Sequence, residues 1–274
     1  YTQKHADALS ACVPLRVQYR MNEGICEFAS KMFYSGNLVA HPSVAHRVLS
    51  GTRGRDRQLQ EAPAITRALL PSLPTVFLRV RNDGNMRPKT SDAEARAVRD
   101  VVAGLLARGV AEEDIGIIAP YRAQVANLRR YLFNSDEQSN RQNNGQSSWQ
   151  GLALTSPLTV DTVDRFQGGE RKVMIISFAT TSAPEANSQL HNFLTNPNRL
   201  NVALTRAQRK LILVGYAPAL KTLPVFKHLL LYCKYNDALI PYQVPPPLPP
   251  KGDHIQSTSA SISREVEADL LRNE

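Results

Sequence analysis

Short apolar runs alternate with amphipathic segments along most of the chain. The apolar runs at 75–80, 115–119, 173–178 and 211–214 predict strands. The run at 115–119 is unbroken, which is typical of a strand buried on both faces. Amphipathic segments of helical length lie between several of these strands. The pattern therefore predicts an α/β domain with a doubly wound parallel sheet and helices on both faces.

Local signals indicate where the predicted helices begin and end. Apolar residues at the i, i+3, i+4 and i+7 positions predict a first helix that stops at Gly36. Ser91 stands three residues before Glu94, which is the capping-box signature of a second helix start. A third helix is predicted at 122–132, and a closing helix starts near Pro224.

Polar and proline-rich segments set the expected limits of the domain. Residues 51–74 show little periodicity and predict a surface excursion, and residues 134–157, rich in Asn, Gln and Ser, predict a mobile insertion. The run PPPLPP near the C-terminal end favours polyproline II, and we favour a plain linker there over a peptide ligand. We therefore expect one domain over 1–235 and a proline-rich linker and tail over 236–274.

Charge and cysteine content narrow the classes of function. The net charge of +9 and the pI near 9.6 favour a polyanionic partner, with a generally basic soluble surface as the alternative. Three cysteines without a Cys-x-x-Cys pair predict neither a disulfide framework nor a zinc site, and favour an intracellular setting, cytoplasmic or nuclear. No membrane-spanning run or signal peptide is present, so we expect no membrane partner. The chain begins without Met, so we expect it to be a piece of a longer protein.

Four polar clusters adjoin predicted strands, at 18–21, 120–124, 161–170 and 198–209. Open parallel sheets bind their ligands in the crevice beyond the carboxyl ends of the strands. We therefore expect that the four clusters can converge on one edge of the sheet.

Arginines in two of these clusters are candidates for binding a nucleotide. Arg20 follows Tyr19 at a strand–helix junction, which suits a ring that stacks on a base and a guanidinium that stabilises phosphoryl charge. Arg199 and Arg206 are about two turns apart on a helix predicted to begin at Pro197, which places them on one face. From the residues alone, surface arginines in salt bridges are an equally good interpretation.

Four motifs, in order along the chain, extend this interpretation. VQYRM, PYRAQ, VDTVDRFQGGE and NRLNVALTRAQRKLILVG resemble motifs IV to VI of superfamily 1 helicases. They are most similar to the branch that includes the nonsense-mediated-decay helicase, the immunoglobulin mu-binding helicase and the Dna helicase-nucleases, over about residues 12–232. The resemblance implies a RecA-like three-layer α/β domain, the second of the two motor domains of an ATP-dependent DNA or RNA helicase or translocase.

The resemblance also implies roles for individual residues at an ATP site. Tyr19 matches the residue that stacks on adenine in this branch, and Arg20 and Arg206 match the arginine fingers that reach the γ-phosphate. Glu170 matches a position whose carboxylate meets the ribose hydroxyls, close to backbone that meets the phosphates. The implied nucleotide-binding residues are therefore Tyr19, Gln167, Gly168 and Glu170.

Other matched segments face the nucleic-acid backbone in these helicases. Pro120, Tyr121, Gln124 and Thr162 are the matching positions here, so the resemblance implies a single-stranded DNA or RNA partner. Backbone contacts do not separate DNA from RNA. Ser91 stands where many relatives carry Asn, so no ligand role follows for it.

The phosphate-binding loop of a complete motor does not occur in this sequence. No G-x-x-x-x-G-K-[ST] run, which cradles the phosphates and Mg²⁺, is found in the 274 residues, and the tetrad at 136–139 resembles a Walker B strand only superficially. We therefore expect ATP and Mg²⁺ to bind between this chain and an N-terminal RecA-like domain that holds the metal. The isolated chain is expected to be inactive. The alternative is a non-catalytic nucleic-acid- or protein-binding module with the same fold.

Overall fold

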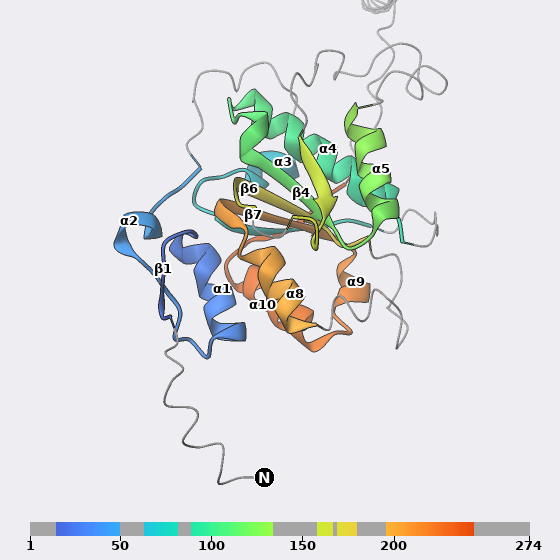
Figure 1. Cartoon of the computed structure of the whole chain (residues 1–274). Helices are drawn as coiled ribbons and strands as arrows, with labels where there is room; N and C mark the ends of the chain where they lie inside the picture. The colour runs from blue at the N-terminus through green and yellow to red at the C-terminus, as the bar shows by residue number, and fades with distance from the viewer. Residues whose placement is uncertain are drawn as a thin grey trace, which may run out of the picture. The chain divides into compact units, whose positions relative to one another are not determined.

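A computed structural model describes six stretches of the chain, all of which belong to one compact unit (Figure 1). The described residues are 15–49, 63–81, 89–133, 158–166, 169–179 and 196–243. The predicted polar insertion, the proline-rich run, Gln167 and Gly168 lie outside the described residues.

A six-stranded sheet forms the centre of the unit, and every neighbouring pair of its strands is parallel (Figure 1). In spatial order the strands are β5 (Thr159–Thr162), β4 (Ile115–Ala119), β6 (Arg171–Ser177), β7 (Ala207–Gly215), β3 (Thr75–Arg79) and β8 (Leu239–Pro241). The strands β4, β6 and β7 are buried over most of their length, as expected for a parallel sheet covered on both faces. The strand β8 lies beyond residue 235, where the sequence places the end of the domain.

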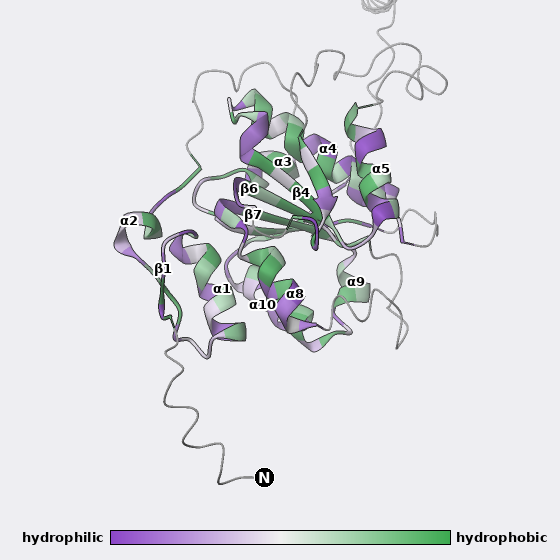
Figure 2. Cartoon of the chain, in the orientation of Figure 1, coloured by the Kyte–Doolittle hydropathy of each residue, from purple (hydrophilic) through white to green (hydrophobic). Residues whose placement is uncertain are grey.

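Helices cover both faces of this sheet (Figure 1). One face carries α3 (Pro63–Ala68), α4 (Asp92–Ala107) and α5 (Arg122–Phe133), and the other carries α1 (Glu23–Phe33), α8 (Pro197–Leu204), α9 (Ala217–Leu220) and α10 (Pro224–Tyr235). Figure 2 shows the central strands as mostly hydrophobic and the helices as mixed, which fits a core between three layers. The predicted α/β architecture is confirmed.

Smaller elements flank the three layers. The strands β1 (Val17–Gln18) and β2 (Val39–Ala40) form a separate two-stranded parallel sheet, and α2 (Pro42–Ala45) follows it. A single 3₁₀ turn, η2 (Glu112–Asp114), leads into β4. Because β1 runs directly into α1, this small sheet carries the predicted strand–helix junction.

The predicted start of α4 is confirmed, with one difference from a capping box. Ser91 caps the helix and accepts a hydrogen bond from the Glu94 backbone nitrogen at 3.2 Å. The Glu94 carboxylate is buried and accepts from the Ser177 hydroxyl at 2.7 Å and from the Ala179 nitrogen at 2.8 Å. These two bonds tie the start of α4 to the carboxyl end of β6.

The predicted surface excursion at 51–74 is wrong in its C-terminal part, because α3 lies there. Ile65, Ala68 and Leu69 are buried and lie at the i, i+3 and i+4 positions of this helix and its end. Three apolar positions over one and a half turns are too few to give a periodic signal, so the contact with the rest of the core decides the structure.

Lys210 of β7 is a fully buried cation in this core. Its ammonium donates to the Leu70 carbonyl at 3.0 Å and to the Leu73 carbonyl, both in the turn after α3. Burial, together with the Arg108 guanidinium, lowers the pKa of Lys210 to about 7.

We expect this buried lysine to make the stability of the protein depend on pH in the alkaline range. Between about pH 7 and the ordinary lysine value of 10.5, the unfolded chain binds a proton that the folded chain does not. The free energy of unfolding therefore rises with pH in this window. Urea unfolding of the wild type and of Lys210→Met, near both ends of the window, measures the effect. The wild type should gain stability relative to the variant as pH rises, and an identical pH dependence would contradict the assignment.

In the described parts of the chain, no helix is long and apolar enough to span a bilayer. The same stretches bring no three His, Cys, Asp or Glu side chains together as a metal site.

Candidate nucleotide site

The four polar clusters lie at two opposite edges of the sheet, so the expectation that they meet at one edge is wrong. Glu170 comes directly before β6 and Arg206 directly before β7, which places both at the amino edge. Pro120 directly follows β4 and Thr162 ends β5, which places both at the carboxyl edge. The apolar runs locate each strand, but they do not indicate at which of its ends a neighbouring polar residue will act.

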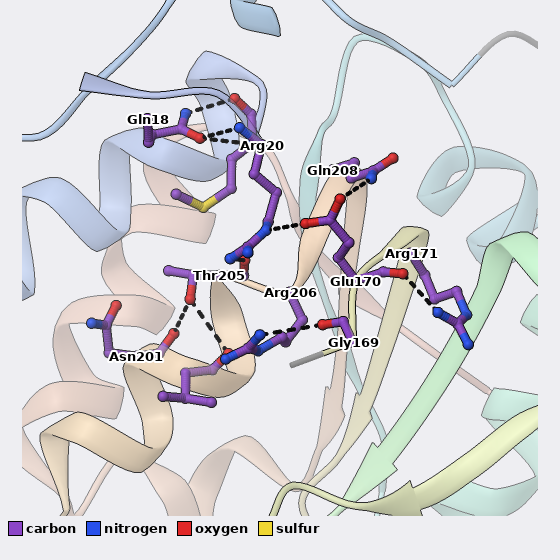
Figure 3. A network of polar contacts seen from close by, with 11 residues as sticks. Gln18, Arg20, Gly169, Glu170, Arg171, Asn201, Thr205, Arg206 and Gln208 are labelled. Carbon is purple, nitrogen blue, oxygen red and sulfur yellow. Dashed lines mark hydrogen bonds and ion pairs between the residues drawn. The ribbon is translucent and has the colours of Figure 1, made fainter. Parts of the chain in front are cut away.

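Arg20 and Glu170 join two distant segments at the amino edge (Figure 3). The Arg20 Nε donates to one Glu170 carboxylate oxygen, and its Nη1 donates to the Thr205 carbonyl at 3.2 Å. The other Glu170 oxygen accepts from Gln208 Nε2 at 2.8 Å. The Glu170 carboxylate is thus held between the β1–α1 junction and the start of β7.

This ion pair is too exposed to serve mainly for stability. The side chains of Arg20 and Glu170 are 37% and 42% exposed, and ion pairs at such positions contribute about 0–1 kcal/mol. The Arg20 guanidinium lowers the pKa of Glu170, and the hydrogen bond from Gln208 lowers it further. Glu170 therefore remains a carboxylate, and since a carboxylate has about four acceptor positions, it can still accept bonds from a ligand.

Arg206 lies beside this pair with unused hydrogen-bonding capacity. Its Nη1 donates to the Gly169 carbonyl at 3.3 Å, whereas its buried Nε has no partner among the described residues. Burial lowers the pKa of Arg206, the nearby Arg20 guanidinium lowers it further, and Glu170 raises it. Arg206 thus adds a second guanidinium close to the Arg20–Glu170 pair, and an anion with several acceptor oxygens fits the excess positive charge.

Arg206 is presented by the link after α8 and not by the helix itself. Asn196 caps α8 by accepting from the Asn198 and Arg199 backbone nitrogens, so the predicted start of the helix is confirmed. The helix ends at Leu204, however, and the Thr205 hydroxyl donates back to a carbonyl of its last turn. The prediction that Arg199 and Arg206 share a helical face is therefore wrong.

Two residues that the sequence analysis missed hold Arg20 in place. The Gln18 Oε1 accepts from the backbone nitrogens of Arg20 and Met21, each at 2.7 Å (Figure 3). Asn22 donates from its backbone nitrogen to the Gln208 carbonyl at 2.9 Å and from its side chain to the Arg209 carbonyl at 3.0 Å. The signal in the sequence is weak: Gln18 and Asn22 are amide residues beside a predicted turn, and such side chains often bond to neighbouring backbone.

Tyr19 projects from the same junction. Its side chain is 64% exposed, and its ring stacks on His41 with 4.3 Å between ring centroids and 27° between planes. Stacking on His41 occupies one face of the ring and leaves the exposed part of Tyr19 for a further planar group. The position of Tyr19 is consistent with the predicted contact to adenine, and His41 is an additional residue there.

At the carboxyl edge, two of the residues that the resemblance implies as nucleic-acid contacts are buried. The Gln124 side chain is fully buried, donates to the Ser177 hydroxyl at 2.9 Å and accepts from the Ser91 nitrogen at 2.9 Å. Tyr121 is 7% exposed, and burial raises its pKa to about 12. Both side chains are thus buried at the β4–α5 junction, and a contact of either with nucleic acid stays a prediction. Pro120 and Thr162 are half-buried and can be reached by a ligand.

Between Thr162 at the carboxyl edge and Glu170 at the amino edge, the polypeptide passes close to β4. Phe166, in the connecting turn, packs against β4 where that strand has Gly116. A Cβ at Gly116 would lie 2.8 Å from the Phe166 ring and 2.6 Å from the Met174 sulfur. Only glycine fits there without moving these side chains.

Comparisons with known proteins show the family to which this chain belongs. A family model described as an AAA domain, AAA_12, matches residues 2–218. The chain is 32% identical over 248 residues to the DNA replication ATP-dependent helicase/nuclease DNA2 of Xenopus laevis, which covers 86% of this chain and 21% of that protein. It is 34% identical over 224 residues to an uncharacterised ATP-dependent helicase of Methanocaldococcus jannaschii, covering 80% of this chain and 29% of that protein.

Among solved structures, the C-terminal domain of a possible DNA helicase from Lactobacillus plantarum aligns with 76% of this chain and 92% of its own, at 16% identity and a TM-score of 0.40. The chain spans between about a fifth and a third of the curated relatives named above, 21% of one and 29% of the other. The resemblance to the superfamily 1 helicase branch is confirmed by the family match and by these relatives. The chain therefore belongs to the AAA domain family AAA_12 and is homologous to the C-terminal helicase domains of the DNA2 and Upf branch of superfamily 1.

Proposed function

We propose that this chain is the C-terminal motor domain of an ATP-dependent DNA or RNA helicase or translocase. In this proposal it supplies one wall of an ATP site, and an N-terminal RecA-like domain of the same protein supplies the other wall and holds Mg²⁺. The observation that carries the proposal is the gathering of two guanidinium groups at the amino edge of the sheet: Arg20 pairs with the Glu170 carboxylate, and Arg206 donates to the adjacent Gly169 carbonyl.

Each residue of this cluster has a proposed role. Arg20 and Arg206 would stabilise negative charge on the γ-phosphate, as cations do in phosphoryl transfer. Tyr19 would stack on the adenine with His41 behind it, and Glu170 would accept hydrogen bonds from the ribose hydroxyls. Bound ATP supplies the free energy of hydrolysis. The positions proposed from the motif for phosphate contact and coupling are Gln167 and Gly168.

The partner at the carboxyl edge is proposed to be single-stranded DNA or RNA. Thr162 and Pro120 would contact its backbone, because both are accessible at the carboxyl ends of β5 and β4. Tyr121 and Gln124 would act indirectly, by fixing the junction that carries Pro120. The strand β6 begins directly after Glu170 at one edge and ends at Ser177 at the other, so a single strand joins the two proposed sites.

The proposed ribose contact of Glu170 can be tested by comparing ATP with 2′,3′-dideoxy-ATP. In the wild-type full-length protein, KM for the dideoxy nucleotide should exceed KM for ATP by about 10- to 150-fold, the value of hydrogen bonds to a charged group. In Glu170→Ala the two nucleotides should have the same KM. Because Arg20 is released by the same substitution, kcat should fall equally for both nucleotides, and the ratio of KM values is the readout.

Asp164→Ala is the matched control for this experiment. Asp164 is also an acidic side chain of the β5–β6 connection, and it is 67% exposed. Its carboxylate lies 3.7 Å from the Arg199 guanidinium and pairs with it, not with the arginines of the nucleotide cluster. This variant should discriminate between the nucleotides as the wild type does. If the ratio of KM values in Glu170→Ala equals the wild-type ratio, Glu170 does not bind the ribose.

A further inference from the structure

A basic groove of about 470 Å³ lies between α5 and the end of β5, away from the nucleotide cluster. Four arginines and one carboxylate line it, together with Thr162 and apolar side chains of α5. The charged residues are Arg122, Arg129, Arg130, Arg165 and Asp161. The cations therefore outnumber the single acid in this groove.

Only part of this positive charge is used inside the protein. Arg130 donates to the Asp92 carboxylate at 3.2 Å, and Arg129 donates to the Val160 carbonyl at 2.8 Å. Arg122 and Arg165 are exposed, and within the described ranges neither has an ion-pair or hydrogen-bond partner. At least two guanidinium groups are thus free to bind an anion from solution.

The residues of α5 that face the groove form a stripe along the helix. Arg122, Ala126, Arg129 and Phe133 follow each other at spacings of four, three and four residues, and all four are exposed. From Arg122 to Phe133 the stripe is about 16 Å long, which is much longer than a single phosphate group. A chain of phosphates therefore matches the groove better than a single anion.

Phe133 at the end of the stripe indicates the kind of polymer. Its ring is 41% exposed at the rim of a strongly cationic groove, where an acidic peptide would gain nothing from it. An unpaired base can stack on an aromatic ring while its phosphates meet arginines, and this combination is typical of single-strand binding sites. A duplex keeps its bases stacked on each other and cannot use the ring.

We infer that the groove along α5 binds the backbone of single-stranded nucleic acid and that Phe133 stacks on a base. The inference rests on the proposed function and extends it. From its contact with Thr162, the bound nucleic acid passes Arg165 and Arg122 and then follows α5 to Phe133. The motifs that resemble helicases include neither Arg129 nor Phe133, so this part of the path extends beyond them.

Binding of the 274-residue chain to a fluorescent oligothymidylate of about 12 nucleotides, over a series of salt concentrations, tests the inference. Arg122→Gln and Arg165→Gln should each reduce the slope of log K against log salt by about 0.7, the value for one lost contact to a single strand. Phe133→Ala should weaken binding by about 5- to 150-fold without changing the slope. The affinity for duplex DNA of the same length should be unchanged by Phe133→Ala.

Lys227→Gln is the matched control, because Lys227 is an exposed cation of α10 on the other face of the sheet. It should leave both the slope and the affinity unchanged. Wild-type salt slopes in Arg122→Gln and Arg165→Gln, absence of binding by the wild-type chain, or equally tight competition by polyaspartate would each overturn the inference. Binding of the oligonucleotide by this chain requires no ATP turnover, so a failure here leaves the proposed ATP site to its own test.

Discussion

Replacing Arg206 with Ala is expected to lower ATP turnover by the full-length protein by about 10³- to 10⁵-fold, or roughly 4 to 7 kcal/mol of barrier. The Arg206 guanidinium lies against Gly169 with its Nε unpaired among the described residues, and the positive charge of Arg20 lies beside it. A phosphate that gains charge in the transition state would use these donors. Steady-state phosphate release at saturating ATP and nucleic acid measures the loss.

Two controls make this experiment specific to a guanidinium at position 206. Arg199→Ala removes a neighbouring, half-exposed arginine that pairs with Asp164 at 3.7 Å, and it should leave turnover nearly unchanged. Arg206→Lys keeps the charge but loses the planar fork of donors, so it should restore little activity. Binding of single strands should survive in all three variants. Near-normal turnover in Arg206→Ala would rule out its role as an arginine finger.

The site is assembled from three segments that are far apart in the chain. Asn22 fastens the segment of Arg20 to the start of β7, and Gln208 of β7 in turn holds Glu170. Because these bonds connect rigid elements, the amino edge should move as one body when the domain moves against a partner. Gln18, which closes the turn before Arg20, belongs to the same support.

Much of the fold could be predicted from local pattern. The strand β4 is an unbroken apolar run and was predicted over its observed range, and α5 differs from prediction by a single residue at its end. Both elements follow from local pattern, because a short apolar run before a proline is typical of a buried strand and apolar residues at helical spacing are typical of a helix. The start of β7 was predicted too late, because Gln208, Arg209 and Lys210 hide the beginning of a strand whose lysine is buried.

The candidate site could be predicted as a set of residues but not as an arrangement. Arg20, Glu170 and Arg206 were each indicated by motif resemblance, yet their pairing depends on contacts between segments about 150 residues apart. The burial of Gln124 could not be predicted, because its motif does not reveal that Ser91 and Ser177 would take up its amide. The groove along α5 depends on the side chains of two elements meeting, which no local pattern indicates.

ATP turnover by this chain is expected to require a second domain, because its 274 residues contain no loop that cradles the β- and γ-phosphates. Arg20, Arg206 and Glu170 can stabilise charge on a phosphate, but they provide neither the backbone cradle nor ligands for Mg²⁺. We therefore expect ATP turnover when the other wall of the site is present and no turnover when it is absent.

ATP hydrolysis by the isolated 274 residues, beside the same residues joined to the nucleotide-binding domain of their own gene product, tests the central claim most directly. We predict no turnover above background by the isolated chain, and turnover by the joined protein that single-stranded nucleic acid stimulates and Arg206→Ala removes. Robust hydrolysis by the isolated chain would contradict the claim that it forms half of an ATP site. A joined protein without ATP turnover would contradict it as well, and would favour a non-catalytic binding module with the helicase fold.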